Sequence, residues 1–389
     1  MTLVLQTQRS AQFVVKISKY CNLRCSYCYE FADLGTKARM PLDLIRALFQ
    51  NIAPYVTRKQ YAEIEFVWHG GEPLLIPLEY YDEISRLQKE IFTDGVRVAN
   101  GLQTNLTVLT NRHLSYLKDR KFFSGLGVSV DPYGDQRVDK RGGQTTPTVL
   151  ANMQRLRDAE IPFGAIVVVA RNTIAHMHDI CRFFDKLGIS TRFLPFYLTT
   201  IDEVISSEQI NSHAVSFDEL IYAFNVIIDE WFRSSNAPNW DPLDEYTDYA
   251  IAHITGKPVY RYDRFETESV FVVNLDGRVW GAGDTYLSEA AYGNLFTDDF
   301  EVILNSASRR LVAARAQERR EKYCAPCPYY GACPGFFVGD ASADQERLLE
   351  SGGCPVRVIV ERILRKFTES GLEGMFSGAR AQAQVRAET

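Results

Sequence analysis

The sequence predicts an α/β fold with a parallel sheet, followed by a smaller C-terminal module that contains a β-hairpin and helices. Apolar runs rich in Val, Ile, Phe and Leu alternate with amphipathic helical stretches between Phe13 and Phe196, which is typical of parallel strands joined by crossover helices. After Phe196 the alternation ends, and an Asp-Gly hairpin signal and a group of cysteines follow. Six strand–helix units fit either a partial barrel or a doubly wound sheet, and in both folds ligands collect at the carboxyl ends of the strands.

The elements of the first part follow from hydrophobic periodicity and from helix start and stop signals. We expect six strands, at Phe13–Ser18, Ala62–Trp68, Val96–Gln103, Gly125–Val130, Phe163–Val169 and Thr191–Phe196. We expect helices between them, at Pro41–Val56, Pro77–Phe92, Arg112–Lys121, Thr148–Ala159 and Ile174–Leu187. Gly188 directly follows the last of these helices and suits a helix C-cap.

The remainder of the chain has a different pattern. It predicts helices at Phe217–Phe232, Tyr246–Thr255, Val302–Arg319 and Pro355–Ser370, and strands at Val270–Asn274 and Arg278–Trp280. These elements divide the chain into a barrel or sheet domain at 1–200, a helical connector at 201–265, a C-terminal module at 266–370 and a flexible tail at 371–389.

The composition excludes several classes of protein. With 389 residues, 46% hydrophobic and 24% charged, the chain is globular, and its net charge of −6 argues against a nucleic-acid partner held by phosphate neutralisation. No stretch approaches the roughly 18 apolar residues of a membrane span, so we expect a cytoplasmic protein without a membrane partner. Eight cysteines in such a chain indicate metal ligation or catalysis before disulfides.

Three cysteines directly follow the first predicted strand. Cys21, Cys25 and Cys28 therefore converge at the carboxyl edge of the sheet. A closed zinc site or a fully ligated iron–sulfur cluster needs four ligands, so three leave one metal position free for a substrate or cofactor. A zinc ion completed by His69 is the alternative.

Four further cysteines form a complete ligand set near the C-terminus, namely Cys324, Cys327, Cys333 and Cys354. Four thiolates suit a structural zinc as well as an iron–sulfur cluster. The eighth, Cys181, lies in a helical pattern and is expected to be a small core residue.

The segment CNLRCSYCYE resembles the CxxxCxxC loop of radical S-adenosylmethionine (SAM) enzymes, in which a [4Fe–4S] cluster keeps one iron open. Polar residues at the following strand ends resemble the cofactor contacts of that family. The resemblance implies that Gly70, Gly71, Glu72 and Pro73 meet the SAM amino group, that Gln103, Asn105, Ser129 and Asp131 contact its carboxylate and ribose, and that Tyr27 packs on its adenine. Taken singly, each polar strand end is more typical of a cap or turn residue, whereas Tyr27 is equally typical of a surface loop. Arg171 and Arg192, near strands five and six, could hold a carboxylate of cofactor or substrate, or form surface ion pairs.

The segment CAPCPYYGACPG with its distant Cys is similar to the auxiliary-cluster module of the SPASM subgroup, whose members mostly modify peptides and proteins. The resemblance implies a partial (β/α)6 TIM-type barrel with a SPASM/twitch-like module, and three cofactors: a SAM-binding [4Fe–4S] cluster, one auxiliary [4Fe–4S] cluster and SAM. Such proteins usually carry a second auxiliary cluster, but no Cys stands before Asp284 or near Phe336 and Phe337, where its ligands would be expected. In similar sulfatase maturases the Asp at this place is thought to act as a base, which makes Asp284 a candidate catalytic residue or, alternatively, a turn Asp.

Taken together, the resemblances imply a radical SAM peptide maturase. It would cleave SAM to a 5′-deoxyadenosyl radical, abstract a side-chain hydrogen from a ribosomally made precursor peptide and install a cross-link, either a cyclophane C–C bond or a thioether. One alternative is oxidation of Cys or Ser to formylglycine, as in anaerobic sulfatase maturases, and another is a non-enzymatic iron–sulfur or zinc sensor. The expected partners are the precursor peptide, a separate leader-recognition protein or the barrel rim in its place, and an external electron donor of the flavodoxin or ferredoxin type.

Overall fold

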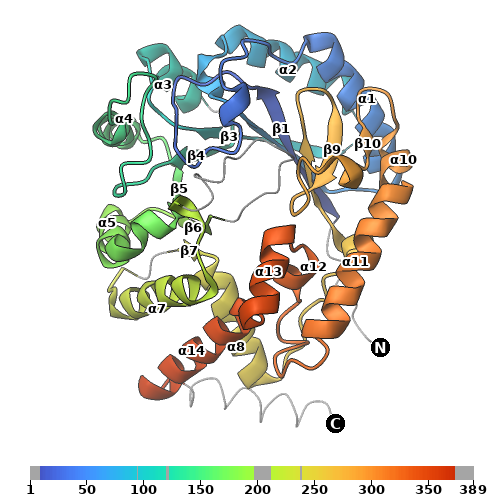
Figure 1. Ribbon diagram of the computed structural model, residues 1–389. Helices are drawn as coiled ribbons and strands as arrows, with labels where there is room; N and C mark the ends of the chain where they lie inside the picture. Colours follow the sequence, from blue (N-terminus) through green and yellow to red (C-terminus); the bar gives the residue numbers. More distant parts are fainter. Residues whose placement is uncertain (1–8, 94, 120–121, 197–211, 237–238, 373–389) are drawn as a thin grey trace.

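The chain folds around one ten-stranded sheet that curves into a partial barrel, with helices on its outer side (Figure 1). This computed structural model describes residues 9–93, 95–119, 122–196, 212–236 and 239–372. The strand order is β10-β9-β8-β1-β2-β3-β4-β5-β6-β7. Strands β1 to β6 are neighbours in chain order without a reversal, which is the order of a barrel and not of a doubly wound sheet. The expected fold class is therefore confirmed.

The strands have the following bounds: β1 Ser10–Ser18, β2 Glu63–Gly70, β3 Arg97–Thr104, β4 Gly125–Ser129, β5 Gly164–Val169, β6 Thr191–Pro195, β7 Trp240–Asp241, β8 Val270–Val273, β9 Arg278–Gly281 and β10 Gly293–Asn294. The main helices are α1 Leu42–Arg58, α2 Leu78–Ile91, α3 Asn111–Lys118, α4 Thr146–Asp158, α5 Met177–Leu187, α7 Phe217–Arg233, α8 Leu243–Thr255, α9 Arg264–Thr267, α10 Phe300–Leu304, α11 Ala307–Tyr323, α12 Phe336–Gly339, α13 Ala343–Gly352 and α14 Pro355–Glu369. Short 3-10 helices are η1 Phe31–Asp33, η2 Pro73–Leu75, η3 Arg171–His176 and η4 Ser288–Ala290.

All six expected barrel strands form, but the prediction of one continuous helix over Val302–Arg319 is wrong. The structure has two helices there, because the Ser306 side chain accepts a hydrogen bond from the Arg309 amide and caps the start of α11. The helix α13 was not expected, although Ser342 and Gln345 form a capping box at its start. Most of the expected tail, from residue 373, and the first part of the expected connector, 201–211, lie outside the described residues.

The hairpin of the C-terminal part extends the barrel sheet directly. Strand β8 pairs in parallel with β1, from Gln12 opposite Val270 to Val15 opposite Val273, and β9 pairs antiparallel with β8. In Figure 1 the helices α13 and α14 lie next to α7 and α8, and α14 contacts both of those helices. Sheet and helices together therefore join segments that are about 100 residues or more apart in the sequence.

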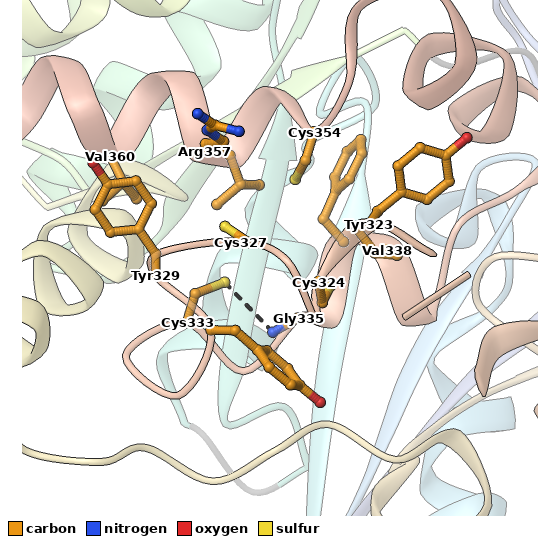
Figure 2. Close-up of a pocket in the computed structure, with 13 residues that line it drawn as sticks. Tyr323, Cys324, Cys327, Tyr329, Cys333, Gly335, Val338, Cys354, Arg357 and Val360 are labelled. Atoms are coloured by element: carbon orange, nitrogen blue, oxygen red, sulfur yellow. Dashed lines mark hydrogen bonds between the residues drawn. The ribbon is translucent and has the colours of Figure 1, made fainter. Parts of the chain in front are cut away.

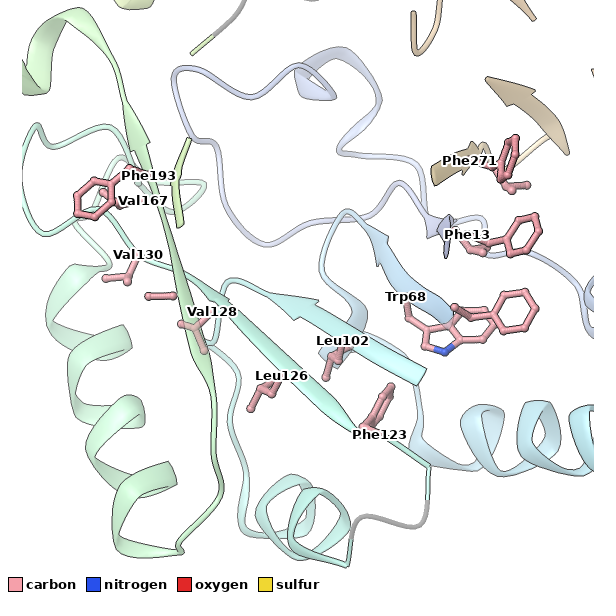
Figure 3. Close-up of a cluster of buried hydrophobic side chains, with 14 of the residues drawn as sticks. Phe13, Trp68, Leu102, Phe123, Leu126, Val128, Val130, Val167, Phe193 and Phe271 are labelled. Carbon is pink, nitrogen blue, oxygen red and sulfur yellow. The ribbon is translucent and has the colours of Figure 1, made fainter. Parts of the chain in front are cut away.

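Aromatic side chains fill the core where β1, β2 and β8 meet (Figure 3). The fully buried Phe13 ring stacks on Phe66 at 5.5 Å and on Phe271 at 5.6 Å, and meets the edge of Phe300 at 5.2 Å. These rings belong to β1, β2, β8 and α10, so a single side chain connects the barrel to the C-terminal hairpin. Among the described helices, none has the length and apolar character needed to cross a membrane.

Replacing Phe13 by Ala tests this connection. The substitution removes a buried ring with three aromatic neighbours and should lower the free energy of unfolding by about 3–5 kcal/mol, measured by urea denaturation. Val302→Ala, at a side chain that is 59% exposed on α10, is the matched control and should stay within about 0.5 kcal/mol of the parent. Equal unfolding midpoints for the Phe13 variant and the parent would contradict the assigned core.

Candidate functional site

The first cysteine loop begins where β1 ends and is held from outside by backbone hydrogen bonds. The Arg24 amide donates to the Val138 carbonyl at 2.7 Å, and the Ser26 amide donates to the Gln136 carbonyl at 2.9 Å. The Cys21 amide donates to the Leu34 carbonyl at 3.1 Å, which closes the loop at its other side. The segment after β4 therefore fixes the positions of the cysteines at the carboxyl end of the barrel.

The three thiols of this loop suit a metal cluster. They are free, with Cys21 and Cys25 buried and Cys28 half-buried. Burial raises the pKa of Cys21 to about 11 and that of Cys28 to about 12, so these thiols need a metal cation to become thiolates at neutral pH. The Leu23 amide and the Asn105 side-chain amide donate to the Cys21 sulfur at 3.4 and 3.6 Å. Hydrogen bonds to sulfur are a usual feature of iron–sulfur sites, and the donor set fits a [4Fe–4S] cluster with three protein ligands.

Two glycines bring the end of β2 against the start of the cysteine loop. The Gly71 amide donates to the Ser18 carbonyl, and the Glu72 amide donates to the Tyr20 carbonyl, both at 2.8 Å. A Cβ atom at Gly70 would lie 2.1 Å from the Ser18 carbonyl oxygen, and one at Gly71 would lie 2.0 Å from that of Tyr20. The two glycines, which the sequence assigns to the SAM amino group, thus allow two backbone segments to approach each other closely.

The Glu72 carboxylate joins the ends of β2 and β3. It is buried, and it accepts hydrogen bonds from the Leu74 amide at 2.8 Å and from the Thr104 hydroxyl and the Asn105 amide, both at 2.7 Å. A carboxylate offers roughly four acceptor sites, so about one remains for an ammonium group. Burial raises the pKa of Glu72 and these donors oppose that rise. Pro73, the next residue, begins η2 and is buried.

The polar ends of β3 and β4 also meet. The Gln103 side-chain amide donates to the Ser129 hydroxyl at 2.8 Å. The Tyr27 hydroxyl donates to Asp131 at 2.6 Å and accepts from Arg137 at 2.6 Å, so the aromatic residue of the cysteine loop is tied to the end of β4. Contact of these residues with SAM stays a prediction, but the structure brings all of them to one end of the barrel.

Arg171 and Arg192 lie outside this group. Arg171 is in η3, its side chain is 46% exposed, and its Nε atom is 3.1 Å from Glu219 of α7. Arg192 pairs with Asp241 of β7 at 3.1 Å and is 58% exposed. These positions favour the surface ion pairs over the expected contact of Arg171 with the cofactor.

A second group of buried polar residues near the cysteine loop was missed by sequence reasoning. Lys16 of β1 is buried, donates to the Tyr29 hydroxyl and lies 3.3 Å from His69 Nδ1. Burial lowers the pKa of Lys16, and burial together with the nearby lysine charge lowers that of His69. A lysine within an apolar strand pattern was the signal available for this group.

The four C-terminal cysteines surround one pocket (Figure 2). The thiols of Cys324, Cys327, Cys333 and Cys354 line it together with apolar and aromatic side chains, among them Phe337. Burial and the neighbouring thiols raise the pKa of Cys324 and of Cys333 to about 12. The Gly335 amide donates to the Cys333 sulfur at 3.4 Å. Within the described ranges no His, Cys, Asp and Glu side chains form a group suited to a single metal ion. Four thiols around a pocket fit a multi-atom iron–sulfur cluster.

The place expected for a further auxiliary ligand has no room for a side chain. A Cβ atom at Gly283 would lie 2.0 Å from the Asp340 carbonyl oxygen. The next residue, Asp284, pairs with the buried Arg264 at 2.7 Å. No spacing pattern in the sequence indicates Arg264, because its partners come from separate segments of the chain.

The fit of Gly71 can be tested by Gly71→Ala. The added methyl group would collide with the Tyr20 carbonyl. The free energy of unfolding should therefore fall by about 1–3 kcal/mol relative to the parent, and the melting temperature should fall with it. Gly35→Ala is the control, because a Cβ atom there meets nothing within 4 Å. A Gly71 variant as stable as the Gly35 variant would contradict the described contact.

The two cysteine groups can be told apart by iron and sulfide analysis of anaerobically reconstituted protein. We expect about eight irons in the parent and about four in a Cys21/Cys25/Cys28→Ala triple variant, because one four-iron cluster is lost. Cys181→Ala removes a buried cysteine of the core and should keep about eight. About four irons together with one zinc in the parent would assign the C-terminal cysteines to zinc.

Known proteins are similar to this chain in its barrel and, at lower identity, over most of its length. Residues 15–184 match the model of the radical SAM superfamily. The chain is 21% identical to a cysteine-type anaerobic sulfatase-maturating enzyme of Clostridium novyi (strain NT), over 84% of this chain and 87% of that protein. It is 34% identical to a serine-type anaerobic sulfatase-maturating enzyme of Klebsiella pneumoniae, but over only 46% of this chain and 45% of that protein.

A solved structure shows the same fold over nearly the whole chain. It is described as native anSMEcpe with bound AdoMet and Cp18Cys peptide, and it matches 95% of this chain and 99% of its own with a TM-score of 0.73 and 18% identity. The SPASM assignment is not tested by these matches. A [4Fe–4S] cluster and SAM are the cofactors that the family implies. The match to radical SAM enzymes therefore argues against the alternative of a non-enzymatic sensor. The match of residues 15–184 to the radical SAM model and the similarity to sulfatase-maturating enzymes together make the chain a radical SAM enzyme.

Proposed function

We propose that the enzyme oxidises the side chain of a Cys or Ser residue in a peptide or protein substrate. The observation that carries this proposal is the position of Asp284 in a loop that also contacts the first cysteine loop. Two residues after Asp284, the Tyr286 hydroxyl donates to Glu30, and Lys19 donates to the same hydroxyl at 3.4 Å. A carboxylate that can accept a proton is thus held on a segment anchored beside the expected radical-generating centre.

The similar proteins support this choice of substrate. Two of the relatives are named as cysteine-type and serine-type anaerobic sulfatase-maturating enzymes, and the similar structure holds AdoMet and a peptide. The Bacteroides thetaiotaomicron relative is 24% identical over 83% of this chain and 81% of its own length. These names favour oxidation of Cys or Ser over the cross-link that the sequence alone indicates, and the cross-link is kept as an outcome of the test.

We assign the cofactors to the residues that fit them. Cys21, Cys25 and Cys28 would hold the cluster that binds SAM, and the strand-end residues around Glu72 would hold the SAM amino and carboxylate groups. The pocket with Cys324 would hold the auxiliary cluster. When bound and reduced, the first cluster with SAM supplies a 5′-deoxyadenosyl radical that removes a hydrogen atom from a C–H bond.

A proton and an electron must leave the substrate after the hydrogen atom has been removed. After the substrate Cβ has lost a hydrogen atom, its thiol or hydroxyl must still lose one proton, and the carbon radical one electron, to form a C=S or C=O double bond. Asp284 accepts the proton. The thiols of the pocket with Cys324 would hold the iron–sulfur cluster that supplies the one-electron acceptor. For a Cys substrate, water then replaces sulfur in the thioaldehyde, with release of hydrogen sulfide. An external donor of the flavodoxin or ferredoxin type would supply the electron that starts each turnover.

The test uses the anaerobically reconstituted enzyme with dithionite, SAM and short sulfatase peptides that carry Cys or Ser. We expect deoxyadenosine and an aldehyde that reacts with a hydrazide probe. Asp284→Asn should still form deoxyadenosine but lower the aldehyde yield at least about 10²-fold, because the proton acceptor is lost. Asp276→Asn, at an exposed aspartate paired with Arg278, is the matched control and should behave as the parent.

Two results would contradict the proposal, one of them the oxidation itself and the other the role of Asp284. A product that lacks two hydrogens but does not react with hydrazide would assign the enzyme to cross-linking. An undiminished aldehyde yield from the Asp284 variant would remove Asp284 from the reaction while leaving the oxidation itself in place.

A further inference from the structure

Two aspartates share one buried arginine beside the hairpin. Arg264 of α9 has a fully buried side chain, and its Nη2 atom lies 2.7 Å from the Asp284 carboxylate. Its Nη1 atom lies 3.6 Å from the Asp340 carboxylate and makes no hydrogen bond. The two aspartate side chains are only 15% and 11% exposed, so both carboxylates depend on the same cation for stabilisation.

The remaining charges around Arg264 are paired with each other. Glu268 lies 3.2 Å from Arg264 Nε and 3.0 Å from Arg309 Nε. Arg309 also donates to the carbonyls of Arg264 and Phe265 at 2.9 Å, so it is fixed in this place. Two guanidinium charges face three carboxylates, and a single carboxyl proton makes the buried group neutral.

The geometry distinguishes between the two aspartates. Asp284 has the shorter contact with Arg264, whereas Asp340 has the longer one and a weak hydrogen bond from the Tyr262 hydroxyl at 3.4 Å. Burial raises the pKa of Asp340 to about 7, although Arg264 opposes that rise. The titratable and charged groups that act on Asp340 come from separate segments: Tyr262, Arg264, Glu268, Asp284 and Arg319.

We propose that Asp284 and Asp340 form a coupled carboxyl pair on Arg264, in which Asp340 holds the proton that makes the buried group neutral. Two carboxylates on one cation cannot both ionise freely, so the proton on one sets the charge of the other. Asp340 is then a positioning residue that keeps Asp284 ready to accept a proton. This use of Asp284 rests on the proposed function, but the protonation of Asp340 does not.

The proton on Asp340 can be observed directly by infrared titration of the reconstituted enzyme labelled with ¹³C-aspartate. The parent should show the carbonyl band of a protonated, buried carboxyl group that disappears with a midpoint at about pH 7. Asp340→Asn should remove this band. Asp284→Asn should move the midpoint to lower pH by about one unit or more, because the competing negative charge is gone. Asp276→Asn, an exposed aspartate of the same hairpin, should leave the titration unchanged.

A band that persists in Asp340→Asn, or an unchanged midpoint in Asp284→Asn, would overturn the pairing. The titration of Asp284→Asn tests the pairing even where the Asp340 variant fails to fold. A titration that behaves as expected, together with no aldehyde from the parent enzyme, would keep the pair and reject the proposed function. The ratio of aldehyde to deoxyadenosine gives a second readout in Asp340→Asn, since this variant should match the parent at about pH 6 and depart from it above about pH 7.

Discussion

The parallel pairing of β8 with β1 is the contact on which the geometry of this enzyme depends. β1 leads directly into the first cysteine loop, and β8 turns into β9, which leads to the loop of Asp284. Residues about 260 positions apart in the sequence are therefore positioned by one ladder of backbone hydrogen bonds. The buried rings of Phe13 and Phe271, one on each strand, stack on each other, and the Phe300 ring meets the edge of both.

At several glycines, backbone atoms of a neighbouring segment occupy the space that a side chain would otherwise fill. Gly70 and Gly71 let β2 lie against the start of the cysteine loop, and Gly283 lets the carbonyl of Asp340 fill the place of a side chain. A Cβ atom at Gly281 would collide with the Glu268 carboxylate at 2.1 Å, so this glycine makes room for the buried charges. Small residues thus decide where the backbone, and with it each reactive group, can approach the barrel end.

Much of the fold could be predicted from the sequence because its signals are local. Buried parallel strands are continuous apolar runs, and the spacing of Cys21, Cys25 and Cys28 lies within one loop. The Arg264 group could not be predicted, because Glu268, Asp284 and Asp340 meet only after β9, α9 and α12 have packed together. The break between α10 and α11 was missed for the opposite reason. The apolar periodicity continues across it, and only the side-chain cap of Ser306 marks the new start.

One short segment connects the two chemical centres of the C-terminal part. Cys333 lines the thiol pocket, α12 begins at Phe336, and Asp340 directly follows its last residue. Tyr262 fixes both ends of this segment, since its amide donates to the Pro334 carbonyl at 2.9 Å and its hydroxyl to Asp340 at 3.4 Å. A change in the thiol pocket that moves α12 therefore also moves Asp340 relative to Arg264. The segment from Cys333 to Asp340 thus connects the thiol pocket to the Arg264 group, although different side chains form each of them.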